Sequence, residues 1–68
     1  MNTAELVYLN RMADAAWRAW YDARLQRDYA RTGGASGEEL ARLQRIADGL
    51  ALELDKADAA VRAALRSN

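Results

Sequence analysis

The chain has 68 residues, so it forms one small domain at most. It contains no histidine, cysteine, proline or phenylalanine, and its ten basic and ten acidic residues cancel. The missing cysteines exclude a disulfide framework and thiolate metal sites, and the missing histidines remove the usual metal ligand and general base. A neutral chain also lacks the long-range field that attracts nucleic acid or an anionic membrane.

The first expected helix covers about residues 3–31. Asn2 and Glu5 have the spacing of a capping box, and nothing from there to Arg31 breaks a helical pattern. Apolar side chains repeat at helical spacing along one broad side. The other side carries Arg11, Asp14, Arg18, Asp22 and Arg27. Charged residues also intrude on the apolar side, so we expect a broad and imperfect stripe.

The loop is expected at residues 32–36. Gly33 and Gly34 can supply the left-handed cap that ends a helix, a conformation that other residues adopt at a cost. Ser36 and Glu39 have the spacing of a second capping box. Stop and start signals this close together predict an antiparallel helical hairpin.

The second expected helix covers about residues 37–66 and has the clearest pattern in the chain. Its apolar residues recur as a coiled-coil stripe of a and d positions. The two registers are Leu40, Ala47, Leu54 and Val61, and Leu43, Leu50, Ala57 and Ala64. Folding the chain at the loop pairs residues whose numbers sum to roughly 68, so that Trp20 faces Ala47. The fold class is therefore all-α, a single coiled-coil-like hairpin over residues 1–68.

One hairpin buries too little apolar surface to offset the ordering of its residues, so we expect other chains to complete the core. A pair of hairpins forming a four-helix bundle is the simplest solution, and a larger assembly is another. Trp20 is expected in the seam of the hairpin, whereas Trp17 and Tyr21 would contact either a second copy or a different protein. The expected interface residues are Leu6, Trp17, Trp20, Tyr21, Leu43, Leu50, Leu54 and Val61.

No motif in the sequence carries a catalytic, cofactor-binding or metal-binding chemistry, so we expect no enzyme and no cofactor. The strongest nucleic-acid candidates are Arg11, Arg18, Arg24, Arg27 and Arg31. They would act as in a dimeric Rop-like RNA- or DNA-binding regulator, which is an analogy of architecture alone. Aspartates interleave with these arginines and would repel phosphate, so a nucleic-acid partner is the alternative and not the main expectation.

The sequence favours a non-enzymatic protein–protein interaction or assembly module. One setting is a small structural or accessory component of a bacteriophage particle, suggested by size, Ala/Arg-rich composition and helix-only content. A small inhibitor that docks on a host protein through its aromatic patch is a further alternative. The N-terminus lacks the features of a signal peptide and no apolar run reaches the length of a membrane span. We therefore expect a cytoplasmic protein, or one within a virus particle assembled there.

Overall fold

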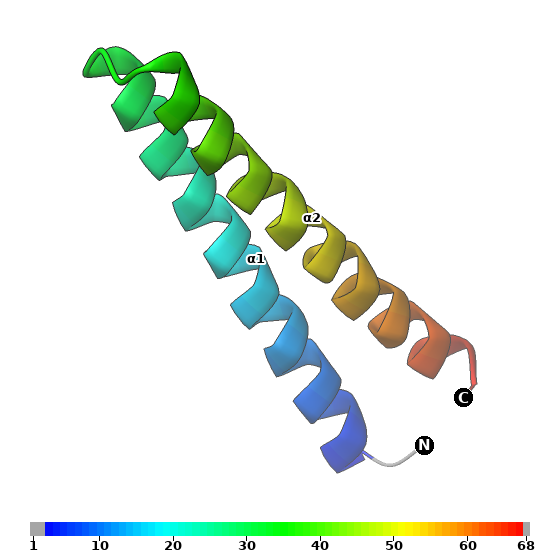
Figure 1. Cartoon of the computed structure of the whole chain (residues 1–68). Coiled ribbons are helices and arrows are strands. Elements are labelled where there is room, and N and C mark those ends of the chain that lie inside the picture. Colours follow the sequence, from blue (N-terminus) through cyan, green and yellow to red (C-terminus); the bar gives the residue numbers. More distant parts are fainter. Residues whose placement is uncertain (1–2, 68) are drawn as a thin grey trace.

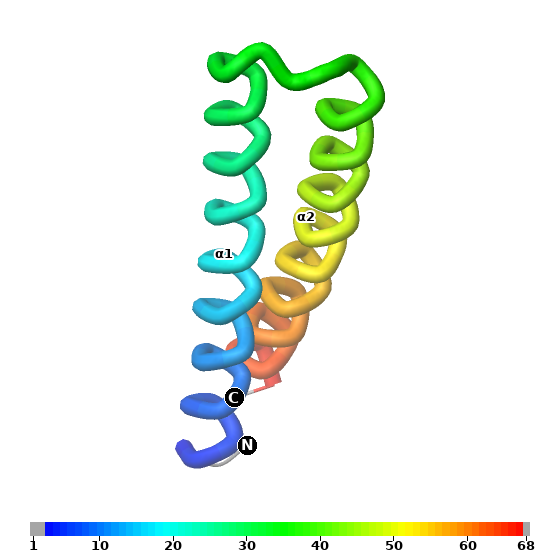
Figure 2. Tube along the Cα trace, turned by 60° about the vertical axis from the view of Figure 1, so that its left-hand side comes forward, coloured from blue at the N-terminus to red at the C-terminus, as the bar shows by residue number. Residues whose placement is uncertain are grey.

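The computed structural model describes residues 3–67 as two antiparallel α-helices joined by a short loop (Figure 1). Helix α1 spans Thr3–Thr32 and helix α2 spans Gly37–Arg66. The predicted all-α hairpin is confirmed, with both helices within a residue of the predicted bounds. The predicted cap at Asn2 lies outside the described residues. A second view shows α2 inclined to α1 along their length (Figure 2), as in coiled-coil packing.

The loop closes α1 with the glycine cap that the sequence predicts. Gly34 has a φ of 81°, in the left-handed region. The Gly34 N–H donates to the Arg31 carbonyl at 3.2 Å, and the Ala35 N–H donates to the Ala30 carbonyl at 2.9 Å. These two bonds form a Schellman motif, which satisfies carbonyls that the helix end would otherwise leave unpaired.

Helix α2 begins at a serine cap. The Ser36 hydroxyl accepts a hydrogen bond from the Glu39 N–H at 3.1 Å, as predicted. The reciprocal bond of a capping box is not formed, because the Glu39 carboxylate accepts from the Arg42 guanidinium instead. Only half of the predicted capping box is therefore present.

The side of α1 that faces α2 is a regular heptad seam within the broad apolar stripe that the sequence predicts. Apart from Leu25, the buried and half-buried residues of α1 follow a 3-4 spacing. They are Leu6, Leu9, Ala13, Ala16, Trp20, Ala23, Arg27 and Ala30. Other apolar residues of the stripe, among them Met12, Ala19 and Tyr29, lie beside the seam and are exposed. On α2, all eight predicted a and d residues are buried or half-buried.

A side-chain hydrogen bond links the two helices near the loop. Arg27 Nη1 donates to Gln44 Oε1 at 2.8 Å. Together with the heptad alternation, this bond indicates that residues at one level have numbers that sum to about 70, close to the predicted sum of roughly 68.

The core of the hairpin is thin. Among the described residues, the buried hydrophobic side chains are Ala23, Leu43, Ala47 and Ala64, and three of the four are alanines. The chain exposes 5010 Å², against about 4,300 Å² for a compact monomer of this mass. Its radius of gyration is 15.5 Å, against about 11 Å for a compact domain of this length. The isolated hairpin is thus an elongated rod with little interior.

Candidate interaction surfaces

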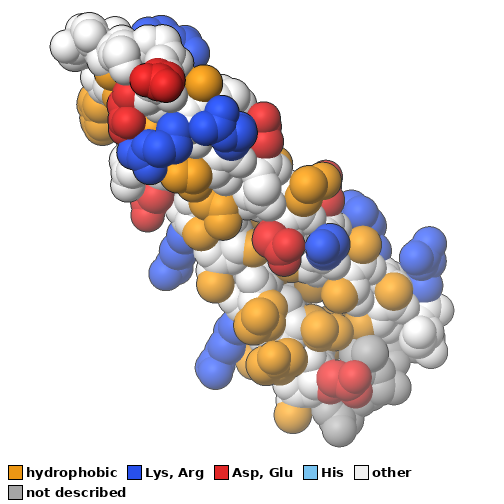
Figure 3. All heavy atoms as spheres, viewed as in Figure 1, with side chains coloured by type: hydrophobic (Ala, Val, Ile, Leu, Met, Phe, Trp, Pro, Cys, Tyr) orange, Lys and Arg blue, Asp and Glu red, His pale blue; other side chains and the backbone are white. Residues whose placement is uncertain are grey.

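The hairpin has two lateral faces, each made from one flank of α1 and one flank of α2. The groove face is the one on which Tyr8 and Met12 of α1 lie across from Lys56 and Ala60 of α2. The aromatic face is the opposite one, and Trp17 is its largest side chain. Figure 3 shows one side of the molecule, on which hydrophobic side chains gather in the half that carries the chain ends. Charged side chains are spread over both halves of this side.

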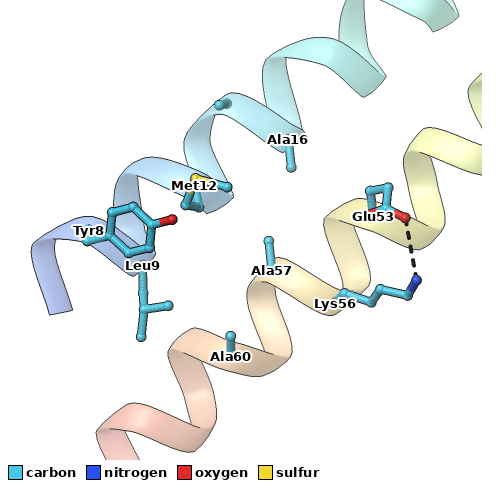
Figure 4. A pocket seen from close by; sticks show the side chains of 9 residues that line it. Tyr8, Leu9, Met12, Ala16, Glu53, Lys56, Ala57 and Ala60 are labelled. Carbon is cyan, nitrogen blue, oxygen red and sulfur yellow. Dashed lines mark hydrogen bonds and ion pairs between the residues drawn. The ribbon is translucent and has the colours of Figure 1, made fainter. Parts of the chain in front are cut away.

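An open groove of about 530 Å³ lies between the helices on the groove face (Figure 4). Its lining residues are Tyr8, Leu9, Met12, Ala15, Ala16, Glu53, Lys56, Ala57 and Ala60. The hollow exists because both helices present alanines there, and a methyl group does not fill the space between two helices. Tyr8 and Met12 form one rim. Glu53 and Lys56 form an ion pair of 3.4 Å at the other. The groove is therefore apolar, and the two charges at its α2 rim cancel each other.

The loop half of the groove face carries exposed apolar side chains. Ile46 lies one heptad before Glu53 on the same flank of α2, and it is 44% exposed. Tyr29 lies three heptads after Tyr8 on the same flank of α1, and it is 73% exposed. The groove face is thus hollow near the chain ends and carries these two apolar side chains near the loop.

The aromatic face is organised by two stacked rings. Trp17 and Tyr21 have ring centroids 5.1 Å apart and planes inclined by 10°. Trp17 is 48% exposed, whereas Trp20 is half-buried in the seam. The Arg24 guanidinium lies 4.8 Å from the centroid of the Trp20 ring, a cation–π contact that covers the outer edge of the seam. The two tryptophans therefore occupy different environments, as the sequence predicted.

Most of the predicted interface residues hold the hairpin itself together. Leu43 is buried, and Leu6, Trp20, Leu50, Leu54 and Val61 are half-buried. Trp17 and Tyr21 are the exposed members of that set. The set left out Tyr8, Met12 and Ile46. Reading α1 in the same heptads as α2 would have placed these three on flanks that share one face.

The five arginines proposed for nucleic-acid binding do not share one face. Arg11 and Arg18 point away from α2, and Arg24 and Arg31 lie on the flank that carries Trp17. Arg27, predicted on the charged side, lies in the seam, where its side chain is 17% exposed. Arg27 faces α2 because it follows Trp20 by seven residues and so occupies the same heptad position.

Arg27 is the centre of a short polar chain across the hairpin. Its guanidinium pairs with Asp28 at 3.0 Å and donates to Gln44. Gln44 Nε2 in turn donates to Asp48 Oδ1 at 2.8 Å. Because partners within the hairpin already occupy this guanidinium, Arg27 belongs to the seam and not to a phosphate-binding surface.

At the loop end, the Arg42 guanidinium hydrogen-bonds the Glu39 carboxylate and lowers its pKa, and the same bond raises the pKa of Arg42.

Within residues 3–67, no cluster of three or more acidic side chains is placed to hold a metal ion. In the same part of the chain, neither helix is long and apolar enough to cross a membrane. Comparisons with protein-family models, with curated proteins and with solved structures found no match.

Proposed function

We propose that this protein is a non-enzymatic helical module that acts by associating with protein, either with copies of itself or within a larger assembly. The observation that carries the proposal is the mismatch between its core and its surface. Among residues 3–67, only four hydrophobic residues are buried, yet nine large hydrophobic side chains are exposed. These are Val7, Tyr8, Met12, Trp17, Tyr21, Tyr29, Ile46, Leu52 and Leu65.

Two further features support association over chemistry. The groove is lined mainly by alkyl groups, and its charged rim is an ion pair, which suits the docking of an apolar side chain. Tyrosine and tryptophan are enriched at the energetic centres of protein interfaces, and both types are exposed here. A small structural component of a multiprotein particle fits these properties. The division of the arginines over three surfaces is the reason why nucleic-acid binding is not preferred.

Sedimentation equilibrium over a hundredfold range of protein concentration tests the proposal. We expect masses that are multiples of 7.6 kDa and rise with concentration. If the protein instead docks on a different partner, the hairpin alone will be monomeric and poorly folded by circular dichroism. A well-folded monomer over the whole range would contradict the proposal, because such a hairpin would need no other chain.

A further inference from the structure

We infer that a second copy of this chain occupies the groove face, with its loop at the opposite end of the molecule. Ile46 of each copy then fills the groove of the other. This inference rests on the proposed function and names the surface and geometry through which it operates. It concerns the groove face alone and leaves the aromatic face free.

The positions of Ile46 and the groove on α2 fit a two-fold axis. Ile46, Glu53 and Ala60 lie on one flank at heptad spacing, so Ile46 and Ala60, at the far end of the groove lining, are about 21 Å apart along the helix. A two-fold axis perpendicular to α2 at the level of Glu53 exchanges these two positions. Each copy therefore presents both halves of a self-complementary contact, as an isologous interface demands.

Helix α1 places the axis at a similar level. Tyr8 at the groove and the exposed Tyr29 lie on one flank, and their midpoint falls between Arg18 and Ala19. In the register that the Arg27–Gln44 hydrogen bond indicates, this midpoint lies close to the level of Glu53. One axis therefore brings Tyr29 of one copy against Tyr8 of the other while it seats Ile46 in the groove.

The side chains near this axis permit close approach. Ala15 and Ala19 of α1 lie there on the groove flank, and their small size lets two helices pack closely. Glu53 and Lys56 of α2 lie there as well, with side chains 63% and 74% exposed. A second copy places another such pair beside the first, so that each lysine can bridge both glutamates. These two pairs add no net charge at the interface centre, where Asp22 lies one heptad after Ala15 on the same flank.

The aromatic face is less suited to the same symmetry. Its α2 flank carries three aspartates, Asp48, Asp55 and Asp58, and one arginine, Arg62, and a two-fold axis there would bring two flanks of net negative charge together.

Two matched substitutions on α2 test the surface. Ile46→Arg places a charge in the apolar groove of the second copy, and we expect the dissociation constant to rise by about 30-fold or more, as for a hot-spot residue. Leu52→Arg is the control, because Leu52 is equally aliphatic and 62% exposed but points away from both lateral faces. We expect it to leave the dissociation constant unchanged in sedimentation equilibrium.

Cysteine cross-linking tests the axis without weakening the interface, since the native chain has no cysteine. Ala19→Cys lies beside the axis and should form an intermolecular disulfide under mild oxidation. Asp55→Cys lies at a similar level on the aromatic face and should not. If the wild-type protein associates but only Asp55→Cys cross-links and Ile46→Arg has no effect, the inference is wrong while the proposed function stands. A well-folded wild-type monomer would overturn both.

Discussion

Trp17 and Trp20 are three residues apart in α1, but their surroundings differ enough to separate their effects on stability. Trp20 packs in the seam under the Arg24 guanidinium. Its replacement by alanine should leave a cavity and lower the free energy of unfolding by roughly 3 kcal/mol. Trp17 is about half exposed and contacts the Tyr21 ring. Its replacement should cost about 1 kcal/mol, the value of an aromatic pair.

Urea unfolding followed by circular dichroism at one protein concentration measures both tryptophan variants. The comparison is internally matched because the same residue type is truncated in the same helix. A larger loss for Trp17→Ala than for Trp20→Ala would mean that the seam and the outer face of α1 are exchanged.

Glu39 gives the hairpin a small dependence on acid. The hydrogen bond from Arg42 lowers the pKa of Glu39 below its unfolded value, so the folded state favours the ionised carboxylate. This stabilisation is complete above the ordinary pKa of a glutamate, about 4.3. It is lost as the pH falls through the lower folded value. Because both side chains are exposed, the effect should be modest.

The test of this pH dependence is thermal unfolding of Glu39→Gln against Glu38→Gln. Both variants remove one negative charge from the first turn of α2, but only the first removes the bond to Arg42. Glu39→Gln should melt below Glu38→Gln at pH 7, and the difference should shrink as the pH falls through the lowered pKa of Glu39. Equal melting temperatures at pH 7 would show that the pair contributes nothing.

Among single residues, Arg27 shows where sequence analysis failed. An arginine between polar neighbours was assigned to the charged side, because hydropathy alone decides such an assignment. Arg27 lies in the seam because it continues the heptad spacing of α1, which is hard to recognise where the seam residues are alanines. Its partner Gln44 lies on the other helix. A long-range hydrogen bond of this kind has no local signal in the sequence.

At the scale of the elements, local chemistry was sufficient for prediction. Glycine at the end of α1 and the Ser36 cap of α2 set the bounds of both helices, because each acts on backbone groups within a few residues. The heptad pattern of α2 was also predicted correctly. The α1 seam was not, since four of its eight positions are alanines that are common on every side of that helix.

Two glycines should respond in opposite directions to alanine. Gly34 has a positive φ, so Gly34→Ala strains the Schellman motif and should lower the free energy of unfolding by roughly 1 kcal/mol. Gly49 lies inside α2 with open space around it, so Gly49→Ala should raise the stability by roughly 1 kcal/mol through helix propensity. Chemical unfolding of the two variants measures both effects.

The glycine comparison also reports on the assembly. Gly49 lies on the α2 flank that borders the groove face, outside the seam. If Gly49→Ala stabilises the protein at low concentration but destabilises it at high concentration, another backbone approaches this position in the associated state. A loss of stability at every concentration would contradict the account of Gly49 as a solvent-facing helical residue.

At the scale of the whole molecule, the sequence predicted that one hairpin needs other chains to complete its hydrophobic core. It did not predict which face of the hairpin stays exposed for them. The faces depend on which heptad positions of α1 form its seam, and the sequence-based stripe did not resolve those positions. With the seam defined, the groove and the exposed Ile46 lie on one face. We therefore expect folding and association to be parts of one equilibrium.

The most direct measurement of that coupling is the melting temperature as a function of protein concentration, followed by circular dichroism. A dimer that unfolds to separate chains should melt roughly 10 °C higher after a hundredfold increase in concentration, given an unfolding enthalpy of about 0.7 kcal/mol per residue. Ile46→Arg should lower the melting temperature at each concentration, and Leu52→Arg should not. A cooperative melting temperature that is independent of concentration would contradict the account, because the hairpin would then be stable without a second copy.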